Sequence, residues 1–467
     1  MARKKPEHPP AMRTDLLPST LTAAKRADVL ALLRAYRRGA VLLGREQWRL
    51  FFETGRFDKN HDRDKVTFAR VVGAANRVQM CRYQVVGQLK SWVSNRQNEF
   101  RNAVNHSKLA PDVKHMLHVI NLREAWFRRD GQRMPETGVP IPDDVRKLAQ
   151  SIMRHVMSRH RRPDLSRISM RLDHRAGSIA RPVNATQGGR VGWWVRLSTM
   201  QKGRKIDVPL LTYDYHKKRS GRVTDGIQIN LDRDGRLTFG VVTDMGDVYA
   251  ASRKAYDGEC EIALDFGLST LFATSEGQLL GQNWLRELRR YDERITKIAR
   301  GMQKRGLKPR QSQRYRHAVR ALRGFLRTEI GRVINKLVEQ GKPKELVLER
   351  LNFQNPALSR RLNRILQNAG RSIIRAKLQD VEDRFGITST EVNPAYTSQT
   401  CSCCGYVDKR HRTSQSTFRC LWCGNVMHAD LNAARNIGER RALSIDSAFQ
   451  GKAAVLADLV RRFGERR

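Results

Sequence analysis

Four of the seven cysteines form two matched pairs. Two residues separate Cys401 from Cys404, two separate Cys420 from Cys423, and fifteen lie between the pairs. A glycine directly follows the second cysteine of each pair, where a tight turn needs a permissive backbone. Two such pairs can present four thiolates to one tetrahedral Zn²⁺ ion. We therefore predict a structural zinc site, because four protein thiolates leave no open position on the metal.

The other cysteines and two nearby histidines are interpreted differently. Cys403 lies inside the first pair and could replace a neighbour as a ligand, although its offset fits the spacing less well. Cys81 and Cys260 stand alone, and we expect each to be a small buried apolar residue. His411 and His428 are expected to face solvent or nucleic acid rather than to bind the metal.

Three acidic residues occupy positions that suit a second kind of metal site. Asp265 and Glu349 each follow an apolar run typical of a buried strand, and Asp430 opens a helical segment just after the cysteines. Such residues can converge at one edge of a mixed sheet, where their oxygens supply the ligands that Mg²⁺ or Mn²⁺ prefers. Two such ions ~4 Å apart would bind a scissile phosphate, activate water and stabilise the leaving oxygen.

Each carboxylate also has a structural interpretation when it is taken alone. Asp430 could simply cap its helix, and Glu349 could be a surface charge beside Arg350. An unpaired carboxylate within an apolar strand is costly, however, unless a partner or a metal compensates its charge. Three more acidic residues lie just upstream of Asp265 but lack its place after the apolar run: Asp257, Glu259 and Glu261.

Hydrophobic spacing predicts the elements that must position these residues. We expect helices from about residue 20 to 160, and then strands of a small β-barrel from about 165 to 255. Trp193 and Trp194 are adjacent, so one should enter the barrel while the other faces outward.

From residue 259 onward, strands and helices alternate. Two long helices joined by a strongly basic linker are expected over residues 284–340, between the strands that end at Asp265 and Glu349. A basic helix over 358–384 and another strand precede the cysteines, and a final helix begins near Asp430.

Positive charge is the dominant compositional feature. The chain has 467 residues, with 89 Lys+Arg against 46 Asp+Glu, a formal net charge of +43. A solvated surface seldom needs such an excess, because self-repulsion destabilises the compact state. A lipid-binding surface would normally have one basic amphipathic segment or a lipidation motif, whereas arginine is scattered here from end to end. An RNA or DNA partner is therefore expected.

The hydropathy pattern excludes a membrane protein. No window approaches the ~20 uninterrupted apolar residues of a spanning helix, and the first residues lack the apolar core of a signal peptide. We therefore expect no membrane partner and a reducing cytosol.

Five segments together resemble the RuvC and zinc-ribbon motifs of TnpB and of the compact type V CRISPR effectors that descended from it. They are, in order, ALDFGLSTLFATSEG, LVLERLNF, YTSQTCSCCG, FRCLWCG and HADLNAARNI. The resemblance is strong from about residue 259 to 440 and is architectural only upstream. It implies that Asp265, Glu349 and Asp430 are the catalytic ligands of a two-ion Mg²⁺ or Mn²⁺ site. The extra thiol, Cys403, and the residues His428-Ala429 before Asp430 depart from the family pattern.

The resemblance also implies a multidomain α+β fold. Its parts would be a helical recognition lobe, a β-barrel wedge domain, and an RNase H-like (RuvC) α/β nuclease domain with an inserted four-cysteine zinc ribbon. The residue pattern places a basic, Pro-rich and flexible amino terminus over 1–20, and it sets the changes of texture near residues 164 and 258. Together with the resemblance, it gives the expected boundaries: the recognition lobe over 21–163, the wedge domain over 164–257, the first two RuvC motifs with a helical insertion (284–340) over 258–395, the ribbon over 396–428, and the third RuvC motif with the last helix over 429–467.

The function implied is that of an RNA-guided DNA endonuclease. A guide RNA would pair with target DNA beside a short flanking motif, and the protein would contact double-stranded and single-stranded DNA. It would act as a monomer or a homodimer on one RNA, in the prokaryotic cytosol and at the nucleoid when bound to DNA. The helix over 358–384 resembles the segment that contacts the guide heteroduplex, and its candidate contacts are Arg360, Arg361, Arg364, Arg371 and Arg375.

Three other function classes are alternatives to this one. The main alternative is an RNA-guided DNA-binding protein that represses or recruits with little or no cleavage. A guide-independent or ribosome-associated zinc-ribbon protein would have no reason to place three carboxylates around its ribbon. A DDE-type transposase would not be expected to separate its third acidic residue from the second motif by a four-thiolate ribbon.

Overall fold

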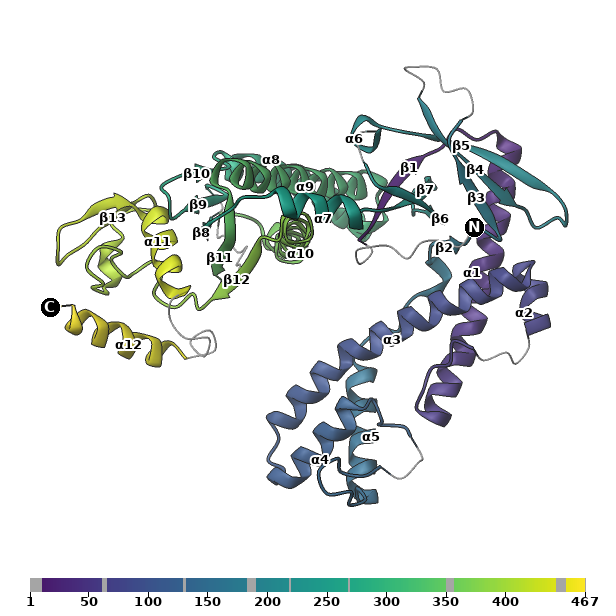
Figure 1. Ribbon diagram of the computed structural model, residues 1–467, viewed down its shortest axis with the longest axis horizontal. Coiled ribbons are helices and arrows are strands. Elements are labelled where there is room, and N and C mark those ends of the chain that lie inside the picture. Colours follow the sequence, from purple (N-terminus) through teal and green to yellow (C-terminus); the bar gives the residue numbers. More distant parts are fainter. Residues whose placement is uncertain are drawn as a thin grey trace. The chain divides into compact units, whose positions relative to one another are not determined.

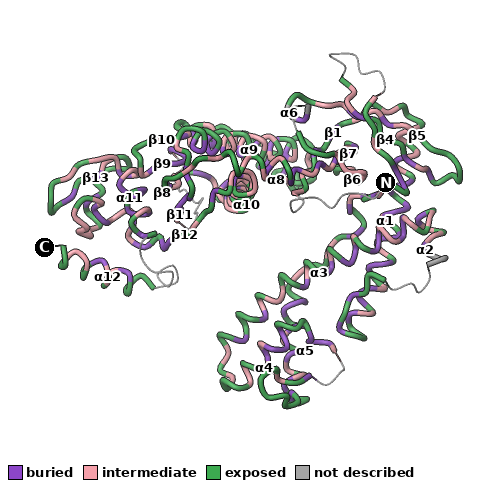
Figure 2. Tube along the Cα trace, in the orientation of Figure 1, coloured by how far each residue is buried: buried purple, intermediate pink, exposed green. Residues whose placement is uncertain are grey.

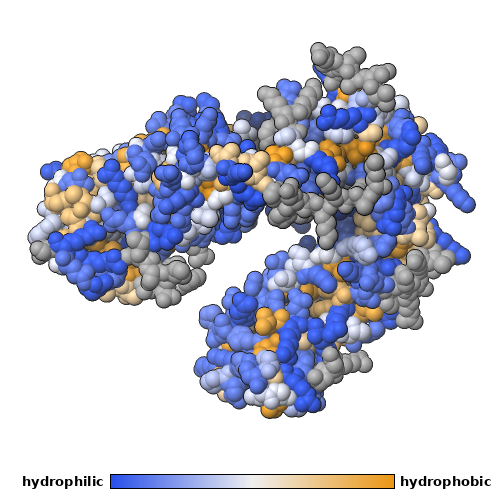
Figure 3. Space-filling model, in the orientation of Figure 1, coloured by the Kyte–Doolittle hydropathy of each residue, from blue (hydrophilic) through white to orange (hydrophobic). Residues whose placement is uncertain are grey.

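The computed structural model describes residues 11–60, 65–128, 132–182, 190–217, 220–267, 269–349, 357–441 and 451–466. The described residues form two compact units (Figure 1), one over Met12–Met245 and the other from Gly246 onward together with Ala11. Hydrophilic residues cover much of the face seen in Figure 3. In the described part of the chain, every helix is too short or too polar to cross a membrane.

The helices predicted between residues 20 and 160 are confirmed. The Thr22 hydroxyl caps α1 by accepting a hydrogen bond from the Lys25 amide (3.4 Å), and the helix ends at Gly55, whose backbone is left-handed (φ 73°). Buried residues recur along α1 and α3 (Figure 2), where apolar side chains of the helices share one core with the strands of this unit. The helices are α1 Ala23–Thr54, α2 Lys65–Val72, α3 Ala75–Asn105, α4 Pro111–Leu122 and α5 Asp143–Ser158.

The strands of the same unit form two antiparallel sheets, with the orders β1-β7-β6-β2 and β3-β4-β5. A barrel would need ladders between the edges of these sheets, but within the described residues one isolated bridge, Ser19–Leu210, links them. No closed barrel is found there, which corrects the predicted β-barrel. Alternating strands show which face is buried but not which edges pair. The strands are β1 Met12–Pro18, β2 Met170–Leu172, β3 Gly177–Ala180, β4 Val191–Ser198, β5 Lys205–Leu211, β6 Arg222–Leu231 and β7 Leu237–Asp244.

Strand β1 corrects a second prediction, because it lies within the segment 1–20 that was expected to be flexible. Met12–Pro18 pair with β7 along their whole length. Leu17 is buried and Leu16 is exposed, the alternation of a strand with one solvated face. Prolines and basic residues around the strand hide this short alternation in the sequence. Residues 1–10 of the predicted segment lie outside the described residues.

A buried polar chain connects β1 with the three-stranded sheet. His216 of the short helix α6 (Asp214–Lys217) lies with Nδ1 2.8 Å from the Asp15 carboxylate, while its Nε2 accepts a hydrogen bond from Trp193 Nε1 at 2.9 Å. Trp193 is buried and Trp194 is exposed. The prediction that one of these two rings points inward and the other outward is confirmed.

The second unit is built on a five-stranded sheet of the order β10-β9-β8-β11-β12. Strands β8, β11 and β12 are parallel, β9 pairs antiparallel with β8, and β10 pairs antiparallel with β9. The strands are β8 Cys260–Phe266, β9 Phe272–Thr274, β10 Leu279–Leu280, β11 Pro343–Glu349 and β12 Thr388–Val392.

Helices cover both faces of this sheet (Figure 1). On one face, Leu264 and Leu348 join an apolar core with α8, α9 and α10. On the other face, Ala263 and Val347 pack against Ile437 of α11. The two long helices and the basic helix predicted from the sequence are therefore confirmed. The helices are α7 Gly246–Ala255, α8 Trp284–Lys304, α9 Gln313–Gly341, α10 Arg360–Phe385 and α11 Ala429–Arg441.

A two-stranded hairpin precedes α11. Its strands are β13 Thr417–Arg419 and β14 Val426–His428, and His428 is followed directly by the first residue of α11. The last helix, α12 (Lys452–Glu465), packs beside this hairpin, with the Phe463 ring 5.2 Å from Tyr406 and 5.7 Å from Trp422. The described residues also include the short 3-10 turns η1 Leu165–Arg167, η2 Pro309–Gln311 and η3 Lys409–His411.

Candidate functional site

Asp265 and Glu349 lie side by side at the carboxyl ends of two adjacent parallel strands. Leu264 of β8 pairs with Leu348 of β11, and each carboxylate residue follows its leucine by one position. Neighbouring strands are about 4.8 Å apart, and residues two apart along a strand share a face. Because Ala263 and Val347 face α11, Asp265 and Glu349 face the same side of the sheet.

Asp430 reaches this edge from the first turn of α11. Ile437 packs against the sheet seven positions later, so Asp430 lies on the same face of the helix, two turns closer to its amino terminus. A Cβ atom at Gly267, the residue after β8, would lie 3.9 Å from Asp430 Oδ2. The structure therefore brings the three predicted carboxylates to one end of the sheet.

Burial and mutual repulsion shape the electrostatics of this carboxylate site. Burial, followed by the negative charges of Glu349 and Asp430, raises the pKa of Asp265 well above its ordinary value. Burial also raises the pKa of Glu349, although a hydrogen bond from the Thr397 hydroxyl (3.0 Å) and the charge of Arg440 oppose this. Three converging acidic groups of this kind need a cation or protons to compensate their charge.

Arg412 is a component of this site that was not predicted from the sequence. Its Nη2 atom lies 3.2 Å from Asp430 Oδ1, and its positive charge lowers the pKa of Asp265. A nearby loop residue, Gln415, donates a hydrogen bond to the Ser269 hydroxyl (3.0 Å), which fastens this loop to the end of β8. Arg412 is one of many arginines in the sequence, so only the fold reveals its position.

The four paired cysteines converge as predicted. Cys401 Sγ lies 3.7 Å from Cys423 Sγ, and Cys404 Sγ lies 3.6 Å from Cys420 Sγ. Thiolates bound tetrahedrally to zinc at 2.3 Å are about 3.8 Å apart, whereas disulfide sulfurs are ~2.05 Å apart. The donor set and its spacing therefore fit one tetrahedral zinc ion.

The remaining cysteines and histidines include two corrections. Cys403 is exposed and lies outside the four-thiol group. Cys81 is buried as predicted, but Cys260 is exposed at the start of β8, where its thiol donates to the Gly341 carbonyl (3.0 Å). His411 is fully buried rather than solvent-facing, because its Nδ1 atom lies 3.0 Å from the Gln399 carbonyl and its ring packs in the ribbon core. His428 is half-buried.

Polar side chains on α11 fix the first cysteine pair relative to Asp430. Asn432 accepts a hydrogen bond from the Ser402 amide (2.9 Å) and donates to the Thr400 carbonyl (2.8 Å). Asn436, one turn later, also donates to the Thr400 carbonyl, at 2.6 Å. The helix that carries Asp430 is thereby attached to the loop that carries Cys401.

The candidate nucleic-acid contacts lie on the polar side of α10. Leu362, Leu366 and Ile374 bury the opposite side in the core of the unit. Arg375 lies 3.9 Å from Glu391, a weak surface pair. Three of the five arginines are exposed: Arg360, Arg364 and Arg375. The other two, Arg361 and Arg371, are half-buried.

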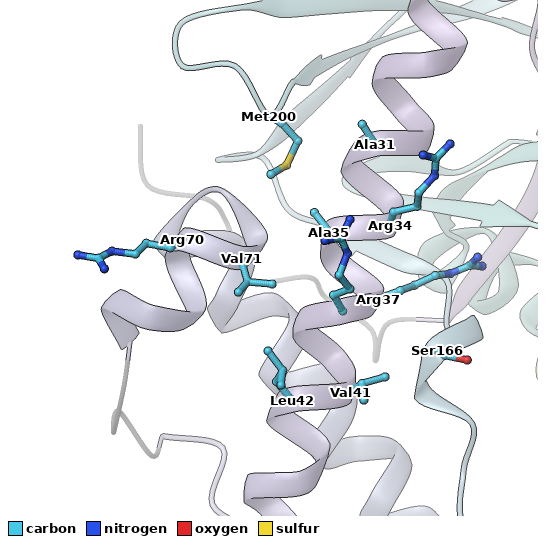
Figure 4. Close-up of a pocket in the computed structure, with 11 residues that line it drawn as sticks. Ala31, Arg34, Ala35, Arg37, Val41, Leu42, Arg70, Val71, Ser166 and Met200 are labelled. Atoms are coloured by element: carbon cyan, nitrogen blue, oxygen red, sulfur yellow. The ribbon is translucent and has the colours of Figure 1, made fainter.

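The Met12–Met245 unit has an open cleft of about 1000 Å³ between α1, α2 and the turn after β4 (Figure 4). Its apolar wall includes Ala35, Leu42 and Met200, and arginines surround it. Arg37 is held by the Ile168 carbonyl (3.0 Å), whereas Arg34 is exposed.

Comparisons with known proteins place part of the chain in a described family. Residues 372–437 match the family model described as Cas12f1-like, TNB domain. The CRISPR-associated endodeoxyribonuclease Cas12f1 of Sulfoacidibacillus thermotolerans is 41% identical over 75 residues, which cover 16% of this chain and 18% of that protein. InsQ of Escherichia coli (strain K12), whose name proposes RNA-guided DNA endonuclease activity, is 29% identical over 263 residues, 51% of this chain and 62% of InsQ.

The chain spans less than two thirds of the length of either curated relative. A solved structure of a Cas12f1–sgRNA–target DNA complex aligns with 92% of this chain and 98% of its own, at 12% identity and a TM-score of 0.40. The sequence matches confirm the resemblance to TnpB and the compact type V CRISPR effectors.

Proposed function

We propose that this chain, a TnpB-like protein similar to the compact type V CRISPR effectors, is an RNA-guided DNA endonuclease. The observation that carries the proposal is the convergence of Asp265, Glu349 and Asp430 at one end of a mixed sheet. The names of the relatives, which describe DNA endonucleases, support the same activity.

In this proposal the three carboxylates hold divalent cations, Mg²⁺ or Mn²⁺. When bound, the cations polarise the scissile phosphate and favour a nucleophilic water. The Thr397 hydroxyl orients Glu349, and Arg412, whose guanidinium lies beside Asp430, is proposed to contact the same phosphate. The zinc ribbon has a structural role, because its four thiolates and the contacts of Asn432 fix the start of α11.

Nucleic-acid binding is assigned to surfaces outside the carboxylate site. The exposed arginines of α10 are proposed to contact the backbone of the guide–target heteroduplex, which is recognised by shape rather than by sequence. The arginine-lined cleft of the Met12–Met245 unit is proposed to contact the flanking DNA motif, because arginine is the commonest reader of guanine in the major groove.

The experiment that tests this function is sequencing of the RNA that copurifies with the chain when its native locus is expressed. One abundant structured RNA with a variable end is expected, and the complex should cut DNA matched to that end when Mg²⁺ is present and not with EDTA. Heterogeneous RNA, or cleavage that ignores the guide, would refute RNA guiding. DNA binding without cleavage would favour the alternative, a guided binding protein.

Arg412→Ala is expected to reduce the single-turnover cleavage rate about 10²–10³-fold, the usual effect of removing one positioned charge at a transition state. Its guanidinium contacts Asp430, so Arg412→Lys, which keeps the positive charge, should restore part of the rate. The matched control is Arg419→Ala, an exposed arginine on the same ribbon. Equal cleavage rates for Arg412→Ala and Arg419→Ala would show that Arg412 takes no part in cleavage.

The raised pKa of Asp265 predicts a pH-dependent response to Mg²⁺. Between the unfolded pKa of about 3.9 and the raised folded value, the folded chain binds more protons than the unfolded chain. The stability contributed by that proton is lost as the pH rises. Mg²⁺ would replace the proton, so it should raise the melting temperature more near pH 8 than near pH 5. Thermal unfolding with and without Mg²⁺ measures this, and a pH-independent shift would contradict it.

A further inference from the structure

The segment from Arg300 to Arg327 concentrates positive charge at the end of the α8–α9 hairpin that is remote from the sheet. It has ten Lys and Arg residues and no Asp or Glu, whereas the mean charge of the chain would give between two and three net charges over this length. The ten residues are Arg300, Lys304, Arg305, Lys308, Arg310, Arg314, Arg316, Arg320, Arg323 and Arg327.

Four of these residues form one face of α9, here called the arginine face: Arg316, Arg320, Arg323 and Arg327. Their spacing of four, three and four positions places them in one row about 16 Å long. A different side of the helix, including Leu322 and Leu326, is buried in the core of the unit. The last three arginines of the row are exposed.

Two arginines of this row, Arg323 and Arg327, have no acidic partner among the described residues. The first acidic residue of α9 is Glu329, beyond the row, and it is bound by Arg332 at 2.5 Å. Like charges one turn apart destabilise a helix, so a row of this kind is best explained by a polyanion that compensates it.

The surroundings of the row favour a double helix over a single strand. Proteins that bind single strands stack bases on exposed aromatic rings, in addition to binding phosphates. Tyr315 is buried here, and the Phe325 ring stacks 5.3 Å from Trp284 inside the unit. The exposed large apolar side chain of the segment is aliphatic, Leu307. The row therefore presents guanidinium groups without a stacking platform.

We infer that the arginine face of α9 binds the phosphate backbone of a double-helical nucleic acid, at a site separate from the carboxylates. This inference rests on the proposed function only in taking the partner to be a nucleic acid. Arg327 lies fourteen residues before the end of α9, about 21 Å along the helix, and β11 with Glu349 follows that end. Contacts at this face would therefore add affinity independent of sequence and would not take part in cleavage.

The test compares two triple variants of the full-length chain, stripped of nucleic acid at high salt. The face variant is Arg320→Gln/Arg323→Gln/Arg327→Gln, and glutamine keeps a good helix propensity. The control variant, Arg289→Gln/Arg294→Gln/Lys336→Gln, removes the same charge from exposed positions of α8 and α9 outside the row. The probes are an RNA duplex, a DNA duplex of the same length and a single strand without secondary structure.

For a duplex probe, the slope of log Kobs against log salt should become shallower by about 2–3 in the face variant, since each lost phosphate contact contributes ~0.9. This corresponds to roughly 10²-fold weaker binding near physiological salt. The control variant should bind like the unchanged chain. The RNA and DNA arms identify which double helix is bound.

Three results would overturn the inference: an unchanged salt slope in the face variant, an equal loss of duplex affinity in the face and control variants, or a loss of single-strand affinity in the face variant equal to its loss of duplex affinity. An unchanged melting temperature of the face variant separates lost contacts from lost folding. The binding assay needs neither Mg²⁺ nor a guide, so the two conclusions can fail separately. If the salt slope becomes shallower in the face variant but the unchanged chain shows no guided cleavage, only the proposed function is refuted. If guided cleavage is found but the salt slope of the face variant is unchanged, only this inference is refuted.

Discussion

Asp265→Asn is expected to reduce the rate of DNA cleavage by at least ~10³-fold while RNA and DNA remain bound. The substitution keeps the size of the side chain but removes the charge that a divalent cation needs, at the point where Glu349 and Asp430 also converge. Removal of a buried charge from a repelling group should not unfold the chain, and in metal-free protein it should raise the melting temperature. Single-turnover cleavage and a filter-binding assay on the same preparation measure the two quantities.

The matched control for this prediction is Glu261→Gln on the same strand. Glu261 is exposed, and its carboxylate lies 3.9 Å from Lys344, so its loss should leave cleavage within about twofold. Cleavage by Asp265→Asn at an unreduced rate would place the catalytic site elsewhere. Loss of DNA binding together with cleavage would indicate instead that Asp265 supports the fold.

The carboxylates were predictable from the sequence because each is coupled to a local signal. An apolar run followed by an acidic residue identifies Asp265 and Glu349, and the parallel pairing of β8 and β11 then places them together. The cysteine pairs were predictable for the same reason, because two residues between the cysteines of a pair are enough to bring both thiols to one metal ion. These parts of the site need little knowledge of the tertiary fold.

Arg412 and His411 were not predictable in this way. Both lie in a basic stretch of the ribbon, and nothing in the residues around them distinguishes the arginine that contacts Asp430 from the histidine that fills the ribbon core. Their roles depend on how the loop folds back over α11. The β-barrel was predicted wrongly for a related reason, because strand pairing between distant segments, such as β1 with β7, leaves no local pattern.

Cys420→Ser is expected to remove zinc from the chain and to abolish DNA cleavage through the loss of ribbon structure. Three thiolates leave a tetrahedral structural site incomplete, and binding of structural zinc contributes about 10–16 kcal/mol in isolated zinc-finger peptides. The ribbon has a small apolar core of its own, with Phe418 as its large fully buried side chain, so the metal must supply much of its stability. Metal analysis and limited proteolysis near residues 400–428 measure the two effects.

Cys403→Ser is the control that makes this prediction specific. Cys403 is exposed and outside the four-thiol group, so its substitution should leave zinc content, protease resistance and cleavage unchanged. Equal zinc loss in both variants would mean that Cys403 is a ligand and that the predicted set is wrong. Zinc loss in Cys420→Ser with cleavage intact would show that the ribbon does not position Asp430. That result would contradict the link through Asn432, which joins the first cysteine pair to the helix that carries Asp430.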